Sequence, residues 1–171
     1  MEIIMKPAIP ARALTATALL FAAAMFGFFF SWSLTMIGLD EAEPLVAVRG
    51  MQAVNESIRT AVFMATFAGT PVLLAAVAAY HAVRQQRQRA IAFAVATVIY
   101  VATVIAVTAI YNVPMNETLA VVDVTEMNAA SVWEEYSGPW QDWNLVRTIG
   151  SGLAVIAGLV GILLPGAKRV S

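Results

Sequence analysis

The chain has 171 residues, of which 60% are hydrophobic and 12% charged, and its formal net charge is −1. With a mean hydropathy of +0.77, it carries more apolar surface than a soluble domain of this length can bury, so the composition predicts an integral membrane protein. The lack of cysteine excludes a disulfide framework and thiolate chemistry. No basic tract indicates binding to nucleic acid.

Four apolar runs, each of about 20 residues or more, are long enough to cross a bilayer. They predict helices at about 13–39, 52–80, 91–111 and 141–164. The first run is longer than the apolar core of a signal peptide, so we interpret it as a retained helix. The fold class expected is all-α, a four-transmembrane-helix bundle forming one integral membrane domain over residues 1–171.

The charged residues divide between the two sides of this bundle. The two termini and the 81–90 loop carry most of the basic residues, whereas the two other loops carry ten of the eleven acids. Because basic loops stay in the cytoplasm, both termini are predicted to be cytoplasmic. The basic residues of that side are Lys6, Arg12, Arg84, Arg87, Arg89, Lys168 and Arg169.

The outer connection from Asn112 to Asn144 is long enough to have structure of its own. We expect a short interfacial helix near 129–136, ended by Gly138 and Pro139. Its aromatic residues have the spacing of anchors at a membrane surface, and an ordinary aromatic belt explains them as well. These residues are Trp133, Tyr136, Trp140 and Trp143.

Small residues recur every fourth position on two of the helices, a pattern that lets membrane helices approach closely. One stripe runs through Gly150, Ala154 and Gly158 to Gly161, and the other through Ala61, Ala65 and Gly69. We expect both stripes to face neighbouring helices.

Polar residues also gather at the outer ends of three helices, where they usually face the bundle interior or a wet cavity. Asn112 and Asn116 are one turn apart if the helix continues past Pro114. The other two faces hold Gln52, Asn55 and Arg59, and Trp140, Asn144, Arg147 and Ser151. We expect Arg147 to bond to Glu117, Glu56 or the Asn112/Asn116 pair. The alternative is structural: asparagines that bond between helices, and arginines that extend to the surface.

The sequence "YNVPMNETLA", followed by W133-E-E-Y136, W140-x-x-W143-N144 and R147-T148, resembles the anthrone-oxygenase-like family. "MQAVNESIRTAVF" is similar to the second-helix motif of that family, and Gly27 to its first. The resemblance implies four membrane helices in the bacterial inner membrane. For fungal members it implies oxidation of anthrones to anthraquinones without a metal or flavin.

The residues support this chemistry in part. Asn112, Asn116, Asn144 and Arg147 offer donors for a developing oxyanion, and Glu117 or Glu56 could act as a base. We therefore name Asn116, Glu117, Asn144 and Arg147 as candidate catalytic residues. The candidate ligand-binding residues are Asn55, Arg59, Asn112, Trp140 and Trp143. No metal site or cofactor is predicted, and the single His81 has no second metal-type ligand near it in the sequence.

Three functions remain open. The first is a cofactor-independent oxygenase-like enzyme whose partners are the lipid bilayer and a lipophilic aromatic substrate. The second is a non-catalytic membrane protein that binds a small ligand or partner, with the polar cluster as structural glue. A transporter is disfavoured because the polar residues lie at one side rather than at the midplane. A cavity beneath Trp140 and Trp143 would favour the enzyme.

Overall fold

The computed structural model describes residues 9–165, and all regular structure in this range is helical. Four helical segments, Ala11–Asp40, Ala61–Val83, Arg87–Ala120 and Ala129–Leu163, are long and apolar enough to cross a membrane. The expectation of an all-α bundle with four membrane spans is confirmed. Lys6, Lys168 and Arg169, which contributed to the predicted orientation, lie outside the described residues.

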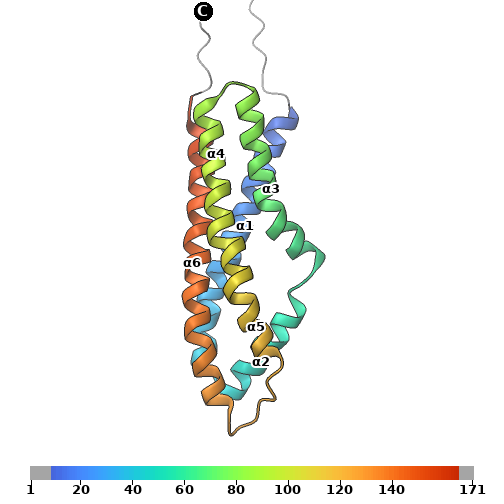
Figure 1. Ribbon diagram of the computed structural model, residues 1–171, viewed down its shortest axis with the longest axis vertical. Coiled ribbons are helices and arrows are strands. Elements are labelled where there is room, and N and C mark those ends of the chain that lie inside the picture. Colours follow the sequence, from blue (N-terminus) through green and yellow to red (C-terminus); the bar gives the residue numbers. More distant parts are fainter. Residues whose placement is uncertain (1–8, 166–171) are drawn as a thin grey trace, which may run out of the picture.

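The long helices run side by side, and shorter ones close one end of the bundle (Figure 1). The start of α1 (Ile9–Asp40), the turn between α3 (Ala61–Val83) and α4 (Arg87–Tyr100), and the end of α6 (Ala129–Leu163) lie together at what we call the terminal end. At the opposite, loop end lie α2 (Pro44–Ser57) and α5 (Val113–Ala120).

The predicted helix 52–80 is two helices rather than one. The chain leaves α2 after Ser57 and starts α3 at Ala61, with Thr60 as its N-cap, whose Oγ1 accepts a hydrogen bond from the Phe63 amide at 3.2 Å. The helix α2 is amphipathic: it starts with Pro44 in its first turn and buries Ala47, Val48 and Met51 at the loop end. This geometry moves the start of α3 away from the bundle axis (Figure 1).

The third span is longer than the predicted 91–111 and contains two wide turns. The π-helical segments η1 (Val101–Ile105) and η2 (Thr108–Asn112) connect α4 to α5. Pro114 lies in the first turn of α5, directly after the wide turn η2, and the backbone before it keeps helical geometry. The chain therefore stays helical past Pro114, as the pairing of Asn112 with Asn116 requires.

The expected interfacial helix is not a separate element. The helix α6 begins at Ala129 and continues through Gly138 and Pro139, so the predicted break there is wrong, as is the predicted start at 141. Trp133 and Tyr136 are buried among side chains of α2 and α5 rather than exposed as a membrane belt. Burial of these two side chains before the proline, and of Trp140 after it, offsets the local loss of a backbone hydrogen bond.

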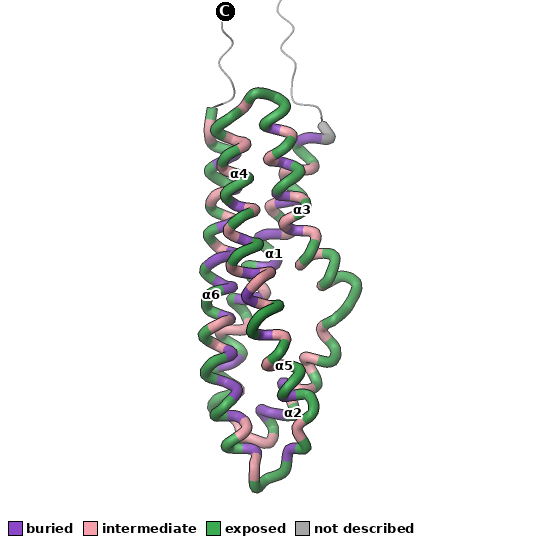
Figure 2. The backbone as a smooth tube through the Cα atoms, viewed as in Figure 1, coloured by how far each residue is buried: buried purple, intermediate pink, exposed green. Residues whose placement is uncertain are grey.

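The small-residue stripe of α6 faces its neighbours, as predicted. A Cβ atom on Gly158 would lie 2.5 Å from Leu19 Cδ2 of α1. A Cβ atom on Gly161 would lie 2.8 Å from Phe93 Cε2 of α4. The stripe on α3 does not pack in this way, because Ala61 and Ala65 are exposed. Buried positions follow the inner faces of the bundle, while the outer faces are largely exposed (Figure 2).

Candidate functional site

A cavity of about 320 Å³ opens at the loop end, where α3 leans away from the bundle. Its walls are mostly apolar and aromatic, with amide and guanidinium groups from α2, the α2–α3 connection, η2, α5 and α6. The lining comprises Phe28, Trp32, Asn55, Ile58, Arg59, Phe63, Met64, Phe67, Thr108, Asn112, Val113, Asn116, Trp140 and Arg147. This size and composition are those of a small-molecule pocket.

Hydrogen bonds fix the orientation of Asn116 at the wall. Its Oδ1 accepts from the Tyr136 hydroxyl at 2.8 Å and from Trp140 Nε1 at 2.9 Å. The Tyr136 oxygen in turn accepts from Asn55 Nδ2 at 3.5 Å. The Asn116 amide nitrogen donates to no other described side chain or carbonyl, so it is available as a donor at the cavity wall.

Arg147 lies inside the bundle between two aromatic rings. Its guanidinium carbon is 4.7 Å from the centroid of Phe29 and 5.1 Å from that of Trp140. One terminal nitrogen donates to Asn144 Oδ1 at 2.9 Å and the other to Thr108 Oγ1 at 3.5 Å. Asn144 is held by its own donations to the Phe29 carbonyl and Ser33 Oγ, each at 3.0 Å.

The expected carboxylate partner of Arg147 is absent within residues 9–165. Glu117 Oε1 instead lies 3.8 Å from Arg59, in a pair whose side chains are 62% and 61% exposed, and Glu56 is exposed. The Asn112/Asn116 pair does not bond Arg147 either. The correct part of the prediction is Asn144, which lies beside Arg147 and accepts from it. Two aromatic faces, one amide oxygen and one hydroxyl oxygen replace the counter-ion.

Two buried polar atoms next to the cavity have no hydrogen-bond partner. They are Nε of Arg147, a donor, and Oδ1 of Asn112, an acceptor. The Asn112 amide nitrogen donates to the Trp140 carbonyl at 3.4 Å. Leaving a buried polar group unpaired costs about 1–3 kcal/mol. A ligand that offers both an acceptor and a donor would satisfy this pair.

Six of the nine residues named from the sequence line the cavity: Asn55, Arg59, Asn112, Asn116, Trp140 and Arg147. Asn144 lies behind Arg147, while Glu117 turns toward Arg59 outside the lining. Trp143 stacks on Tyr111, with ring centroids 3.5 Å apart, and does not close the cavity mouth.

Sequence reasoning missed the aromatic wall. Phe28 and Trp32 of α1, and Phe63 and Phe67 of α3, are four positions apart and therefore share a helix face. That spacing was the available signal, but long apolar helices have aromatic residues on lipid-facing sides as well. Thr108 and Tyr136, which support Arg147 and Asn116, were also missed as parts of the site. Within the described range, no group of three or more His, Cys, Asp or Glu residues could hold a metal ion.

Comparison with known proteins places this arrangement in a family. The family model described as anthrone oxygenase matches residues 58–157, which include most of the cavity lining. No curated protein and no solved structure matches the chain. The matched region spans α3 to most of α6 and contains the Asn112, Asn116 and Arg147 positions. The chain is a multi-pass membrane protein that belongs to the anthrone oxygenase family.

Proposed function

We propose that the loop-end cavity binds a lipophilic aromatic ketone that carries a hydroxyl group, and that the protein oxidises it as an anthrone oxygenase does. The observation that carries this proposal is the unpartnered pair beside the cavity, Arg147 Nε and Asn112 Oδ1. A ketone oxygen accepts from the first, and a phenolic hydroxyl donates to the second. The aromatic side chains of the wall provide stacking surfaces for a flat ring system.

The reaction needs a stabilised enolate. Loss of one proton from the CH₂ group of an anthrone gives an enolate, whose oxygen Arg147 would hold with help from the Asn116 amide. The enolate carbon then donates electrons to O₂ and forms a C–O bond. The resulting peroxide takes up a proton to form a hydroperoxide. Loss of the proton from the second C–H bond then forms the new C=O and cleaves the O–O bond, and the departing hydroxide takes up a proton to leave as water. The sum is anthrone plus O₂ giving anthraquinone plus water.

The proton acceptor in this reaction would lie at the mouth of the cavity. No carboxylate lines the cavity within the described residues, so the proton would leave through the mouth, where Arg59 pairs with Glu117. Glu117 therefore remains the carboxylate we propose for this role. The same observation favours a second function, a binding protein that holds the aromatic compound without converting it.

A lipophilic substrate would enter from the bilayer. A shallow groove between α1 and α3 shares Phe28, Ile58 and Phe63 with the cavity. Its remaining lining is apolar apart from threonines: Ala24, Met25, Thr60, Val62 and Thr66. We propose that this groove is the lateral entrance.

The test uses protein reconstituted in vesicles, with a hydroxylated anthrone as substrate. Oxygen uptake and quinone absorbance are recorded together, and the slow air oxidation in empty vesicles is subtracted. We expect both signals to rise with the protein and to fall at least tenfold in Arg147→Met. Arg49→Met, an exposed change on α2, should leave them unaltered. Tryptophan quenching by the anthrone without oxygen uptake would identify the binding protein instead. The absence of both quenching and oxygen uptake would contradict both functions.

A further inference from the structure

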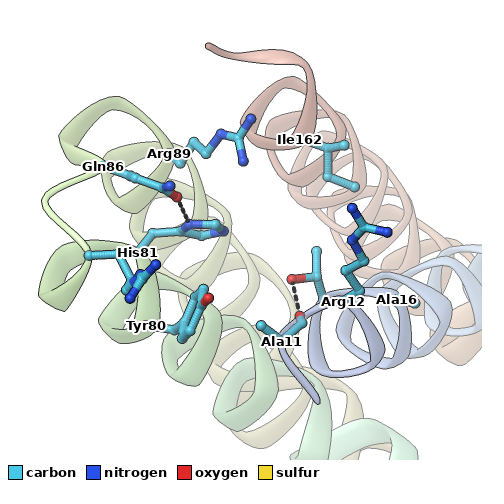
Figure 3. Close-up of a pocket in the computed structure, with 10 residues that line it drawn as sticks. Ala11, Arg12, Ala16, Tyr80, His81, Gln86, Arg89 and Ile162 are labelled. Carbon is cyan, nitrogen blue, oxygen red and sulfur yellow. Dashed lines mark hydrogen bonds between the residues drawn. The ribbon is translucent and has the colours of Figure 1, made fainter. Parts of the chain in front are cut away.

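A second cavity, of about 600 Å³, lies at the terminal end of the bundle (Figure 3). The first turns of α1, the last turn of α3, the start of α4 and the last turn of α6 surround it. Its lining comprises Ala11, Arg12, Thr15, Ala16, Tyr80, His81, Arg84, Gln86, Arg89 and Ile162. We call it the basic pocket, and none of its residues contributes to the loop-end cavity.

The charges of the basic pocket are all of one sign. Arg12, Arg84 and Arg89 line it, and no carboxylate does. All ten acidic residues of the described range belong to the loop-end half of the bundle. Nothing among the described residues neutralises these three guanidinium groups, so the pocket presents a positive potential to an incoming anion.

The three arginines differ in how they are held. Arg89 is fixed, because its Nε and one terminal nitrogen donate to the Leu164 carbonyl at 2.9 and 2.7 Å. Arg12 and Arg84 are exposed, and their side chains form no hydrogen bond or ion pair with another described residue. In Figure 3, Arg12 and Arg89 reach toward one opening from opposite helices. The pocket thus combines one positioned cation with two that are free to bind a ligand.

Neutral groups complete the lining. His81 Nδ1 and Gln86 Oε1 lie 2.6 Å apart, which orients the imidazole, and Tyr80 adds a phenol. Ala11, Ala16 and Ile162 make the remaining surface apolar. A ligand that matches this lining has an anionic head of several oxygen atoms and an apolar portion.

We propose that the basic pocket binds a phosphate ester: either the headgroup of an anionic phospholipid or a soluble phosphate compound. Phosphate oxygens accept hydrogen bonds from several guanidinium groups at once. The pocket lies where the membrane-spanning helices end, which is the depth of lipid headgroups, and basic pockets between membrane helices bind such lipids. This proposal is independent of the oxidation proposed for the loop-end cavity.

The test measures lipid binding to the purified full chain in a neutral detergent by native mass spectrometry. Phosphatidylglycerol is titrated in one arm and phosphatidylcholine in another; a third arm adds inorganic phosphate or glycerol phosphate as competitor. The variants are Arg12→Gln, Arg84→Gln and the pair together. Ala16→Trp fills the pocket without changing charge. Arg87→Gln is the matched control, since Arg87 is an exposed arginine at the same end that does not line the pocket.

We expect one phosphatidylglycerol to bind saturably, with affinity about fivefold lower for each arginine removed and roughly 25-fold lower for the pair. Ala16→Trp should abolish binding, and Arg87→Gln should leave it within twofold. Competition by millimolar phosphate would identify the soluble compound, and its absence the lipid. Equal losses of affinity in Arg87→Gln and Arg12→Gln would overturn the proposal, as would saturable binding that survives Ala16→Trp. In either case the lipid would bind to a diffuse positive surface and not to the pocket.

Discussion

The two ends of this bundle use arginine in opposite ways. At the loop end, Arg147 is buried between Phe29 and Trp140 and bonds to neutral oxygens, although carboxylates are plentiful near that end. At the terminal end, Arg12 and Arg84 are exposed, and no described carboxylate is nearby. Burial next to a rigid aromatic wall suits recognition of one oxygen atom on a flat ligand. Exposed, unpaired arginines suit attraction of a diffuse anion.

The difference between the ends would first be sharpened by determining which side of the membrane each occupies. We expect a reporter fused after Ser171, and another inserted beside Gln85 at the exposed tip of the α3–α4 turn, to be cytoplasmic, because the basic residues cluster there. One inserted at Glu126 should be external. A cytoplasmic signal at Glu126 is incompatible with the four-span arrangement.

Arg147→Met tests the buried arginine. The substitution removes the guanidinium of a residue that lines the cavity, so binding of a hydroxylated anthrone should weaken about ten- to a hundredfold. The thermal stability in detergent should change little, because relief of an uncompensated buried charge offsets the lost bond to Asn144. Titration of tryptophan fluorescence and a melting curve measure the two effects. Arg49→Met is the control, and equal, mild effects of the two changes would mean that Arg147 has no role in the site.

Gly158→Leu tests the packing that holds both ends in place. The new side chain would overlap Leu19 of α1, and overpacking of this kind costs about 1–3 kcal/mol. The melting temperature in a fixed detergent should therefore fall. Gly27→Leu is the matched control, since a Cβ atom on Gly27 meets nothing within 4 Å. An unchanged melting temperature for Gly158→Leu would show that the stripe faces lipid instead.

The smallest effect is expected for Tyr136→Phe. It removes the hydroxyl that donates to Asn116 Oδ1 while Trp140 still holds that oxygen. Ligand affinity should fall about two- to tenfold, the worth of one ordinary hydrogen bond. Tyr111→Phe serves as the control, because the exposed Tyr111 stacks on Trp143 and its ring remains. If both variants bind equally well, the orientation of Asn116 does not matter for binding.

The sequence allowed the four spans to be predicted because hydropathy and helix length report directly on the bilayer. It also allowed Asn112, Asn116 and Arg147 to be predicted at one end of the bundle, since polar residues deep in apolar helices rarely face lipid. The break between α2 and α3 was missed, because α2 is amphipathic and joins the apolar run without a glycine or proline between them. Such a break depends on tertiary burial of Ala47, Val48 and Met51, which local propensity does not reveal.

The partners of Arg147 could not be predicted for a related reason. Glu117 is one position from Asn116, yet successive residues of a helix point about 100° apart. Asn116 therefore faces the cavity while Glu117 faces Arg59 and solvent. Proximity in sequence suggested a carboxylate, but side-chain direction selected the Asn144 amide and two aromatic rings. Trp143 shares a helix face with Trp140, three positions earlier, but it packs on Tyr111 and not on the cavity, which spacing alone did not reveal.

The wide turns η1 and η2 have a consequence for how this protein tolerates insertions and deletions. A π-helical turn accommodates about one residue more than an α-helical one. Loss of a single residue within Val101–Ile105 would therefore close a wide turn and leave Asn112 on the same side of the helix. Met115 lies in an α-helical segment without a wide turn, so its deletion would rotate Asn116 by about 100° relative to Asn112. Relatives that share the cavity are expected to vary in length between Tyr100 and Asn112, but to keep the four-residue step from Asn112 to Asn116 unchanged.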